Sequence, residues 1–375
     1  MAAKAFPAIY PLAGRQPAPS QGTVFPAVAG RLQGVLSYFP AHVSVALSRL
    51  PVTVWDNAEE IRLRVHRPLT VTTGERDLWV TPAGTVTHDP AAALHPDPED
   101  VETALQLMCQ GSVYAREEEL RAGFITLAGG YRVGIAGRTI IENGTIRGIR
   151  PVTSLAVRIP REIKDVASGV LPLLLAGEKV DSRRFMSTLV VSAPRGGKTT
   201  MLRDLVRLLS SGHSPSRWPG ARVVLVDERA EVAASYLGVP QCDVGLRTDV
   251  LDGCPKAAGL MLAIRALAPQ ILATDEIGGP ADVAALAEAA VAGVAVLATA
   301  HARDRADVLA RPGLRDLVQT GVFQRLVVIS RRQGPGTVEA VLDEDGAPVF
   351  SPGTAQGYEA GDSPAVPRQA WGARP

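Results

Sequence analysis

Hydrophobic positions follow two different rhythms along the chain, and the change between them divides it. In EEIRLRVH, residues 59–66, apolar Ile61, Leu63 and Val65 fall on one face and charged residues fall on the other. This alternation predicts a strand with one buried face. From Ser187 onward, short and wholly apolar runs recur between helix-like segments. That second rhythm is typical of a parallel sheet with helices on both faces.

The first part, residues 31–165, predicts a small α+β domain. Helical spacing of apolar residues appears in AGRLQGVLSYFPAHVSVAL and again in PEDVETALQLMCQGSVYAREEELRAG, where acidic residues cluster near the start. DLWVTPAGTVTH predicts a hairpin around residues 82–84, and GFITLAGGYRVGIAGRTI predicts two strands joined at Gly129 and Gly130. A further strand pair is expected through SLAVRIP.

The second part, residues 186–350, predicts an α/β domain. Its expected strands are 189–192, 223–227, 271–275, 294–299 and 325–330. Residues 166–185 between the two parts are expected to be a linker. The ends are rich in Pro, Gly and Ala, which predicts a flexible lead-in over 1–30 and a disordered tail over 351–375.

The composition mainly excludes classes of protein and of partner. The 375 residues carry a net charge of +1, so charge alone favours neither nucleic acid nor another charged partner. Three scattered cysteines indicate a reducing compartment rather than a disulfide framework. No apolar run reaches the roughly 20 residues that span a bilayer, and no secretory signal is visible. We therefore expect a cytoplasmic protein that reaches a membrane only through another protein.

A phosphate-binding loop is predicted after the strand 189–192. SAPRGGKT, residues 192–199, fits G-x-x-x-x-G-K-[ST] except that Ser192 replaces the first Gly. Paired glycines let backbone N–H groups approach a phosphate, and the following helix presents its positive end. We expect Lys198 to reach the β- and γ-phosphates and Thr199 to hold Mg²⁺, whereas the alternative is a plain Gly-Gly turn before a helix. The expected nucleotide-binding residues are Ser192, Ala193, Pro194, Arg195, Gly196, Gly197, Lys198, Thr199 and Thr200.

An acidic partner for this loop follows the apolar strand in APQILATDEIGG. Asp275 is expected to orient Mg²⁺, and Glu276 to polarise the attacking water. The next strand, in GVAVLATAHARD, is expected to lie between the loop strand and the acid strand. Thr299 or His301 at its end would then sense the γ-phosphate, although a lone histidine is more often structural.

A second acidic group ends the strand in VVLVDERAEVA. Asp227, Glu228 and Glu231 would face the ligand side of an open α/β sheet, where Glu228 is expected to steady the metal or the water. The alternative is a solvated charge cluster. Further along, Arg247 and Asp249 precede a helix, and Arg247 would either pair locally or reach the nucleotide of a neighbouring subunit.

Together these segments resemble the stage III sporulation protein AA family, a branch of the secretion-ATPase superfamily that drives type II secretion and type IV pili. The likeness covers about residues 55–330 and rests on EEIRLRVHRPL, SVYAREEELRAGFITLAGGYRVGIAGR, SLAVRIPRE, SAPRGGKTTMLRDLVR, VDERAE, GLRTDVLDGCPKAAGLMLAIRALAPQILATDEIG and VLATAHA. A Ser in place of the first loop Gly is usual in this branch. His66 departs from it, in a turn where Gly is expected.

The resemblance implies a RecA-like ATPase that uses ATP and Mg²⁺ and assembles with itself, as a hexamer. It also implies a membrane protein partner in a channel-like complex between mother cell and forespore. Lys198 and Thr199 match the Walker A motif, and Asp275 with Glu276 matches Walker B. Glu228 and Glu231 resemble the acidic box of the superfamily, and His301 resembles its histidine box.

The resemblance further implies that arginines of the N-terminal domain contact the γ-phosphate. The candidates are Arg132, Arg138 and Arg158, although alternating arginines on a strand are more often a solvated face. Two other functions stay open. A nucleic-acid-dependent ATPase would call for a basic stripe, which the near-neutral charge does not favour, and no basic extra domain of the kind found in plant and algal relatives is visible. An ATP-binding scaffold without turnover is disfavoured by intact Lys198, Asp275 and Glu276.

Overall fold

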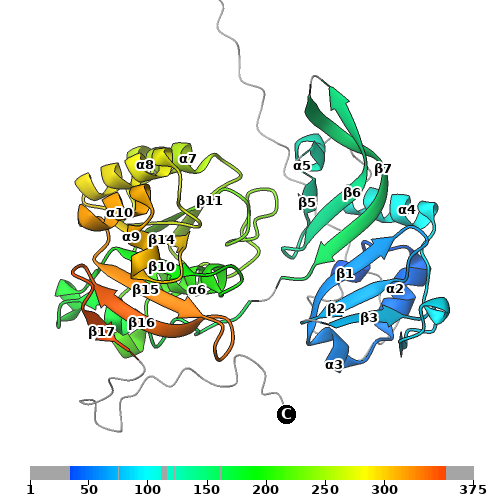
Figure 1. Cartoon of the computed structure of the whole chain (residues 1–375), viewed down its shortest axis with the longest axis horizontal. Coiled ribbons are helices and arrows are strands. Elements are labelled where there is room, and N and C mark those ends of the chain that lie inside the picture. The colour runs from blue at the N-terminus through cyan, green and yellow to red at the C-terminus, as the bar shows by residue number, and fades with distance from the viewer. Residues whose placement is uncertain are drawn as a thin grey trace, which may run out of the picture.

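Two sheets organise the chain in the computed structural model, which describes residues 34–351 except 75, 111–115, 122, 143 and 161. The lead-in expected over 1–30 and the tail expected over 351–375 lie outside the described residues, apart from Ser351. One sheet and its helices form an N-terminal domain, and the other sheet forms a C-terminal domain beside it (Figure 1).

The N-terminal domain is built on a seven-stranded antiparallel sheet of order β4-β3-β2-β1-β7-β6-β5. The strands are β1 (Ala58–Arg64), β2 (Thr70–Thr73), β3 (Arg76–Val80), β4 (Val86–Thr87), β5 (Phe124–Thr126), β6 (Arg132–Glu142) and β7 (Thr145–Arg158). The helices are α2 (Ala41–Ser48), α3 (Val52–Trp55), α4 (Pro98–Met108) and α5 (Glu117–Arg121).

Local sequence explains these elements. Ile61 and Leu63 of β1 are fully buried while Arg62 between them is exposed, as the alternation predicts. Helix α4 begins at a capping box, in which the side chain of Asp97 accepts from the backbone of Asp100 and the reverse bond also forms. The predicted hairpin around residues 82–84 is present as β3 and β4. His66 adopts a φ of +53°, the left-handed conformation for which Gly was expected.

The C-terminal domain is built on an eight-stranded sheet of order β12-β11-β13-β14-β10-β15-β16-β17, antiparallel only in its last two strands. The strands are β10 (Thr188–Ser192), β11 (Val223–Asp227), β12 (Thr248–Asp252), β13 (Ile271–Thr274), β14 (Ala295–His301), β15 (Arg325–Ser330), β16 (Thr337–Asp343) and β17 (Pro348–Phe350). The helices are α6 (Lys198–Ser211), α7 (Lys256–Ala266), α8 (Pro280–Val291), α9 (Arg305–Leu309) and α10 (Pro312–Gln319).

This sheet is covered on both faces, so every residue of β10, β11 and β13 is buried. Val190 belongs to the core formed with helix α6, whereas Val191 belongs to the core formed with α7, α8 and α10. The predicted α/β class is confirmed, as is the position of β14 between β10 and β13. The carboxyl ends of β10, β14, β13 and β11 therefore meet at one edge.

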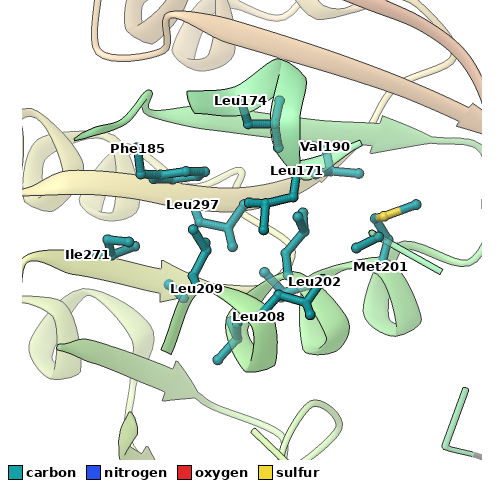
Figure 2. Close-up of a cluster of buried hydrophobic side chains, with 14 of the residues drawn as sticks. Leu171, Leu174, Phe185, Val190, Met201, Leu202, Leu208, Leu209, Ile271 and Leu297 are labelled. Carbon is teal, nitrogen blue, oxygen red and sulfur yellow. The ribbon is translucent and has the colours of Figure 1, made fainter. Parts of the chain in front are cut away.

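Residues 166–185 do not form the linker that we expected. Val166, Val170, Leu171, Leu174 and Phe185 are buried in the core around helix α6. Figure 2 shows Leu171 and Leu174 on one side of this core and residues of α6 on the other. The segment holds a short helix, η3 (Leu171–Leu174), and a two-stranded sheet of β8 (Leu175–Ala176) and β9 (Arg184–Phe185). It is thus packed as part of the C-terminal domain.

Candidate nucleotide site

The predicted phosphate loop connects β10 to α6 and depends on its two glycines. Gly197 caps α6 with a φ of +95°, and a Cβ added there would lie 2.5 Å from the backbone nitrogen of Gly336. A Cβ added at Gly196 would lie 2.3 Å from Ser192 Oγ. The Gly336 N–H also donates to the Gly196 carbonyl at 2.8 Å. The β15–β16 turn therefore leaves room only for glycine at 197, and the Ser192 side chain leaves room only for glycine at 196.

Ser192 fits this loop without distortion. It has no positive φ, so its position does not call for glycine. Its side chain is buried, and its hydroxyl donates to the Ala193 carbonyl at 2.7 Å. The serine that departs from the general pattern thus closes the base of the loop.

Three predicted residues form one hydrogen-bonded chain beside the loop. Lys198 Nζ lies 3.0 Å from His301 Nδ1, and His301 Nε2 lies 3.0 Å from Glu276 Oε1. A protonated lysine can only donate, so Nδ1 of His301 accepts and Nε2 carries the proton donated to Glu276. Neutral His301 therefore links the phosphate-loop lysine to the glutamate that we expect to activate water.

Burial lowers the pKa of Lys198, and the nearby Glu276 carboxylate opposes this effect. Lys198 is 6% exposed. A desolvated ammonium gains more from an anionic partner than a hydrated one does. An anion placed beside Lys198 would therefore be strongly stabilised.

Glu276 is held by its backbone as well as its carboxylate. Its N–H donates to Thr299 Oγ1 at 2.8 Å, and its carbonyl accepts from Lys256 Nζ at 2.9 Å. Its φ is +42°, an unusual value that is typical of functional sites. Thr299 is therefore a backbone partner of Glu276, and Lys256, which sequence reasoning missed, is a second one.

The acids predicted at neighbouring strand ends do meet. Glu228 lies 3.7 Å from Lys256 Nζ, and Asp275 is buried at the end of β13. Burial first, and Asp227 second, raise the pKa of Asp275 to about 6. The pocket at this edge measures about 190 Å³ and is lined by Glu228, Arg229, Lys256, Asp275, Glu276, Gly278, Gly279 and Asp282.

Asp227 has a structural role. Its carboxylate accepts backbone N–H groups of Glu231, Val232 and Ala233 at 2.8–3.0 Å. Burial nevertheless raises its pKa. These bonds hold the backbone of residues 231–233 against the end of β11.

The remaining candidate residues lie elsewhere. Arg158 is 3.6 Å from Glu60 and its side chain is 68% exposed. Arg138 lies exposed on β6, while Arg132 contacts Glu231 of the C-terminal domain. Arg247 pairs locally, because its Nη1 donates to the Ser210 carbonyl at 2.8 Å.

The residues expected for Mg²⁺ are compatible with that ion. The Thr199 hydroxyl and the Asp275 carboxylate form no hydrogen bond with the described residues, so both oxygens are available. The described part of the chain contains no group of three or more His, Cys, Asp or Glu arranged for a metal. Mg²⁺ at phosphate sites takes most of its ligands from water and phosphate and needs few from protein.

Asp252 at the end of β12 makes the stability of the chain depend on pH. Burial, followed by repulsion from Asp227, raises its pKa from 3.8 to about 6, and its Oδ1 has no hydrogen-bond partner. A raised carboxyl pKa favours the folded state at low pH, and this advantage is lost as pH rises from about 4 to 6.

Asp252→Asn is therefore expected to stabilise the chain by about 1–3 kcal/mol at pH 7.5 and by about half as much at pH 5. Urea unfolding at both pH values measures the difference. Asp249→Asn, an exposed position on the same strand, is the control and should change little. An equal gain at both pH values would contradict the assignment.

None of the described helices combines the length and the apolar character needed to cross a bilayer.

The family model for "Sporulation stage III, protein AA" matches residues 40–349. Stage III sporulation protein AA of Bacillus subtilis (strain 168) is 39% identical over 312 residues, which are 83% of this chain and 95% of that protein. Protein SEEDLING PLASTID DEVELOPMENT 1 of Arabidopsis thaliana is 26% identical over 203 residues, 53% of this chain and 27% of that protein.

Among solved structures, the Legionella pneumophila ATPase DotB superposes with a TM-score of 0.51 over 80% of each chain, at 14% identity. At this identity the likeness establishes the fold, which is the expected RecA-like one. The family model covers most of the chain, and the Bacillus subtilis protein is matched over nearly its whole length. The chain therefore belongs to the sporulation stage III protein AA family.

Proposed function

We propose that this protein hydrolyses ATP to ADP and phosphate and that the edge formed by β10, β14, β13 and β11 is its active site. The observation that carries the proposal is the hydrogen-bonded chain from Lys198 through His301 to Glu276. The ammonium of Lys198 and the carboxylate of Glu276 lie on either side of one imidazole, and we assign them phosphate binding and water activation. In-line phosphoryl transfer to water calls for a cation on the phosphates and a residue that orients the water, and these two side chains can supply both.

In this proposal the phosphate loop binds the β- and γ-phosphates, and Lys198 leaves His301 to contact them. Glu276 orients the attacking water and accepts its proton. Mg²⁺, held by Thr199 and Asp275, would neutralise negative charge on the phosphates. His301 would lose its lysine partner when nucleotide binds. The hydrogen bond between His301 and Glu276 would then differ between the nucleotide-free and the nucleotide-bound site.

We further propose that the chain acts as a ring-forming motor, a homo-hexamer bound to a membrane protein of a channel-like sporulation complex. It would lie in the cytoplasm, at the inner face of the membrane, through that partner. Family membership and the near-complete coverage of the Bacillus subtilis protein support this proposal. Glu228, which directly follows β11, would help to position the metal or the attacking water.

Phosphate release by the full chain tests the proposal. We expect turnover that requires Mg²⁺, stops with EDTA and is unchanged by single-stranded DNA. Strong stimulation by DNA would instead identify a nucleic-acid-dependent ATPase. Tight ATP binding without release of phosphate would identify a scaffold.

A further inference from the structure

The two domains meet along one loop of the C-terminal domain, residues 229–243, which we name the docking loop (Figure 1). Gly129 N–H donates to Gln241 Oε1 at 2.8 Å, and Gln110 Nε2 donates to Tyr236 Oη at 3.0 Å. The guanidinium of Arg116 lies 5.1 Å from the centre of the Tyr236 ring. All three contacts join an N-terminal residue to the docking loop.

Arg132 supplies one ion pair to the docking loop, and Lys164 supplies another, with its Nζ 2.7 Å from Asp243 Oδ2. The Nη1 of Arg132 donates to Glu231 Oε1 at 2.5 Å and also lies 3.3 Å from the Arg229 carbonyl. The other side of the guanidinium stacks on the Phe124 ring, 4.0 Å from its centre. The side chains of Arg132 and Glu231 are 24% and 35% exposed, so water screens the pair only in part.

The docking loop is tied to the phosphate loop through helix α6. Arg203, on that helix, donates to the backbone carbonyls of Glu231 and Val232. Asp227, at the end of β11, holds the same residues through their N–H groups. The position of Glu231 is therefore set by the helix that begins at Lys198.

The backbone of the docking loop is strained. Ala230, Ala234 and Leu237 all have φ values of 50–51°, which residues with a Cβ seldom adopt. Such conformations persist only where surrounding contacts hold them, and they concentrate at switch regions. Movement of α6 or loss of the N-terminal contacts would allow this loop to relax.

We propose that the Arg132–Glu231 ion pair is a latch that holds the N-terminal domain on the docking loop, and that Arg203 is the positioning residue that connects this latch to the phosphate-loop helix. Arg132 makes one hydrogen bond to Glu231, whereas a phosphate offers a guanidinium two parallel bonds. A nucleotide phosphate within reach of Arg132 would therefore compete with Glu231. This release step rests on the proposed ATPase function, but the latch in the nucleotide-free chain does not.

Distances between spin labels on the two domains test the latch in the full chain without nucleotide. Labels on cysteines introduced at exposed Val52 and Val291 report the domain separation, with Cys254 replaced by serine. We expect one main distance in the parent and a roughly two- to fivefold larger undocked fraction in Glu231→Gln. Glu339→Gln, which removes a carboxylate paired with Arg332 outside the docking loop, is the matched control and should resemble the parent.

Exchanging the charges of Arg132 and Glu231 distinguishes loss of this ion pair from a general loosening of the fold. Arg132→Glu alone should undock the domain, and Arg132→Glu combined with Glu231→Arg should restore the parent distance. Arg203→Ala should undock it as Glu231→Gln does, and the two changes together should add little, because both act through Glu231. An unchanged distance in Glu231→Gln, or no restoration in the exchanged pair, would overturn the latch. Absence of ATP turnover in the parent would overturn the proposed function and leave this result untouched.

Discussion

Replacing Glu276 by glutamine is expected to lower ATP turnover by about two to four orders of magnitude, while ATP still binds. Glutamine keeps the size of the side chain and can still accept from His301 Nε2. It cannot accept a proton from water, so the chemical step loses its base. The backbone bonds of Glu276 to Thr299 and Lys256 do not involve the carboxylate and should survive the change.

Single-turnover phosphate release and fluorescent-nucleotide binding measure the two effects separately. Glu288→Gln, at an exposed position of α8, is the matched control and should behave as wild type. Because ATP should persist on Glu276→Gln, its mass by light scattering with ATP also tests the ring. Wild-type turnover in Glu276→Gln would remove Glu276 from the catalytic role, and a monomer with ATP would contradict the hexamer.

Lys198→Ala is expected to weaken ATP binding by about 10²–10⁴-fold, because charge-assisted hydrogen bonds to the phosphates are lost. The same change should leave the thermal stability of the nucleotide-free chain equal or higher. Burial already lowers the pKa of Lys198, so the folded chain holds this ammonium at an unfavourable desolvation energy.

Calorimetric titration with ATP measures the binding affinity, and thermal unfolding of the same sample measures the stability of the nucleotide-free chain. Lys179→Ala, an exposed lysine of the same domain, serves as the comparison and should alter neither. A loss of binding accompanied by a clear loss of stability would mean that Lys198 supports the fold rather than the ligand.

Local pattern was sufficient for much of the fold. Strands β10, β11, β13, β14 and β15 are short and mainly apolar, and their spacing indicates the class of the sheet and the edge where the candidate site lies. The loop SAPRGGKT could be recognised as a candidate phosphate loop because its motif is contained in eight consecutive residues. The strand order brings His301 near Lys198 and Glu276, but the hydrogen bonds among them are seen only in the structure.

Other features depend on contacts between distant segments. Residues 166–185 contain proline and glycine and resemble a connector, yet their leucines fill a gap beside α6. Strand β12, TDVLD, is partly polar because it lies at the sheet edge, so it gives no apolar run. The bond of Lys256 to the Glu276 carbonyl and the pairing of Arg132 with Glu231 join residues 20 and 99 positions apart. No local pattern indicates either partner.

The hydrogen bond from Gly336 to Gly196 has a consequence for affinity. A loop that is already shaped loses little conformational entropy when its ligand arrives, so more of the contact energy is available for binding. Here the shaping comes from a turn more than 130 residues downstream, which need not touch the nucleotide. If the loop binds nucleotide as proposed, substitutions in the β15–β16 turn should change the affinity while every residue of the loop itself stays the same.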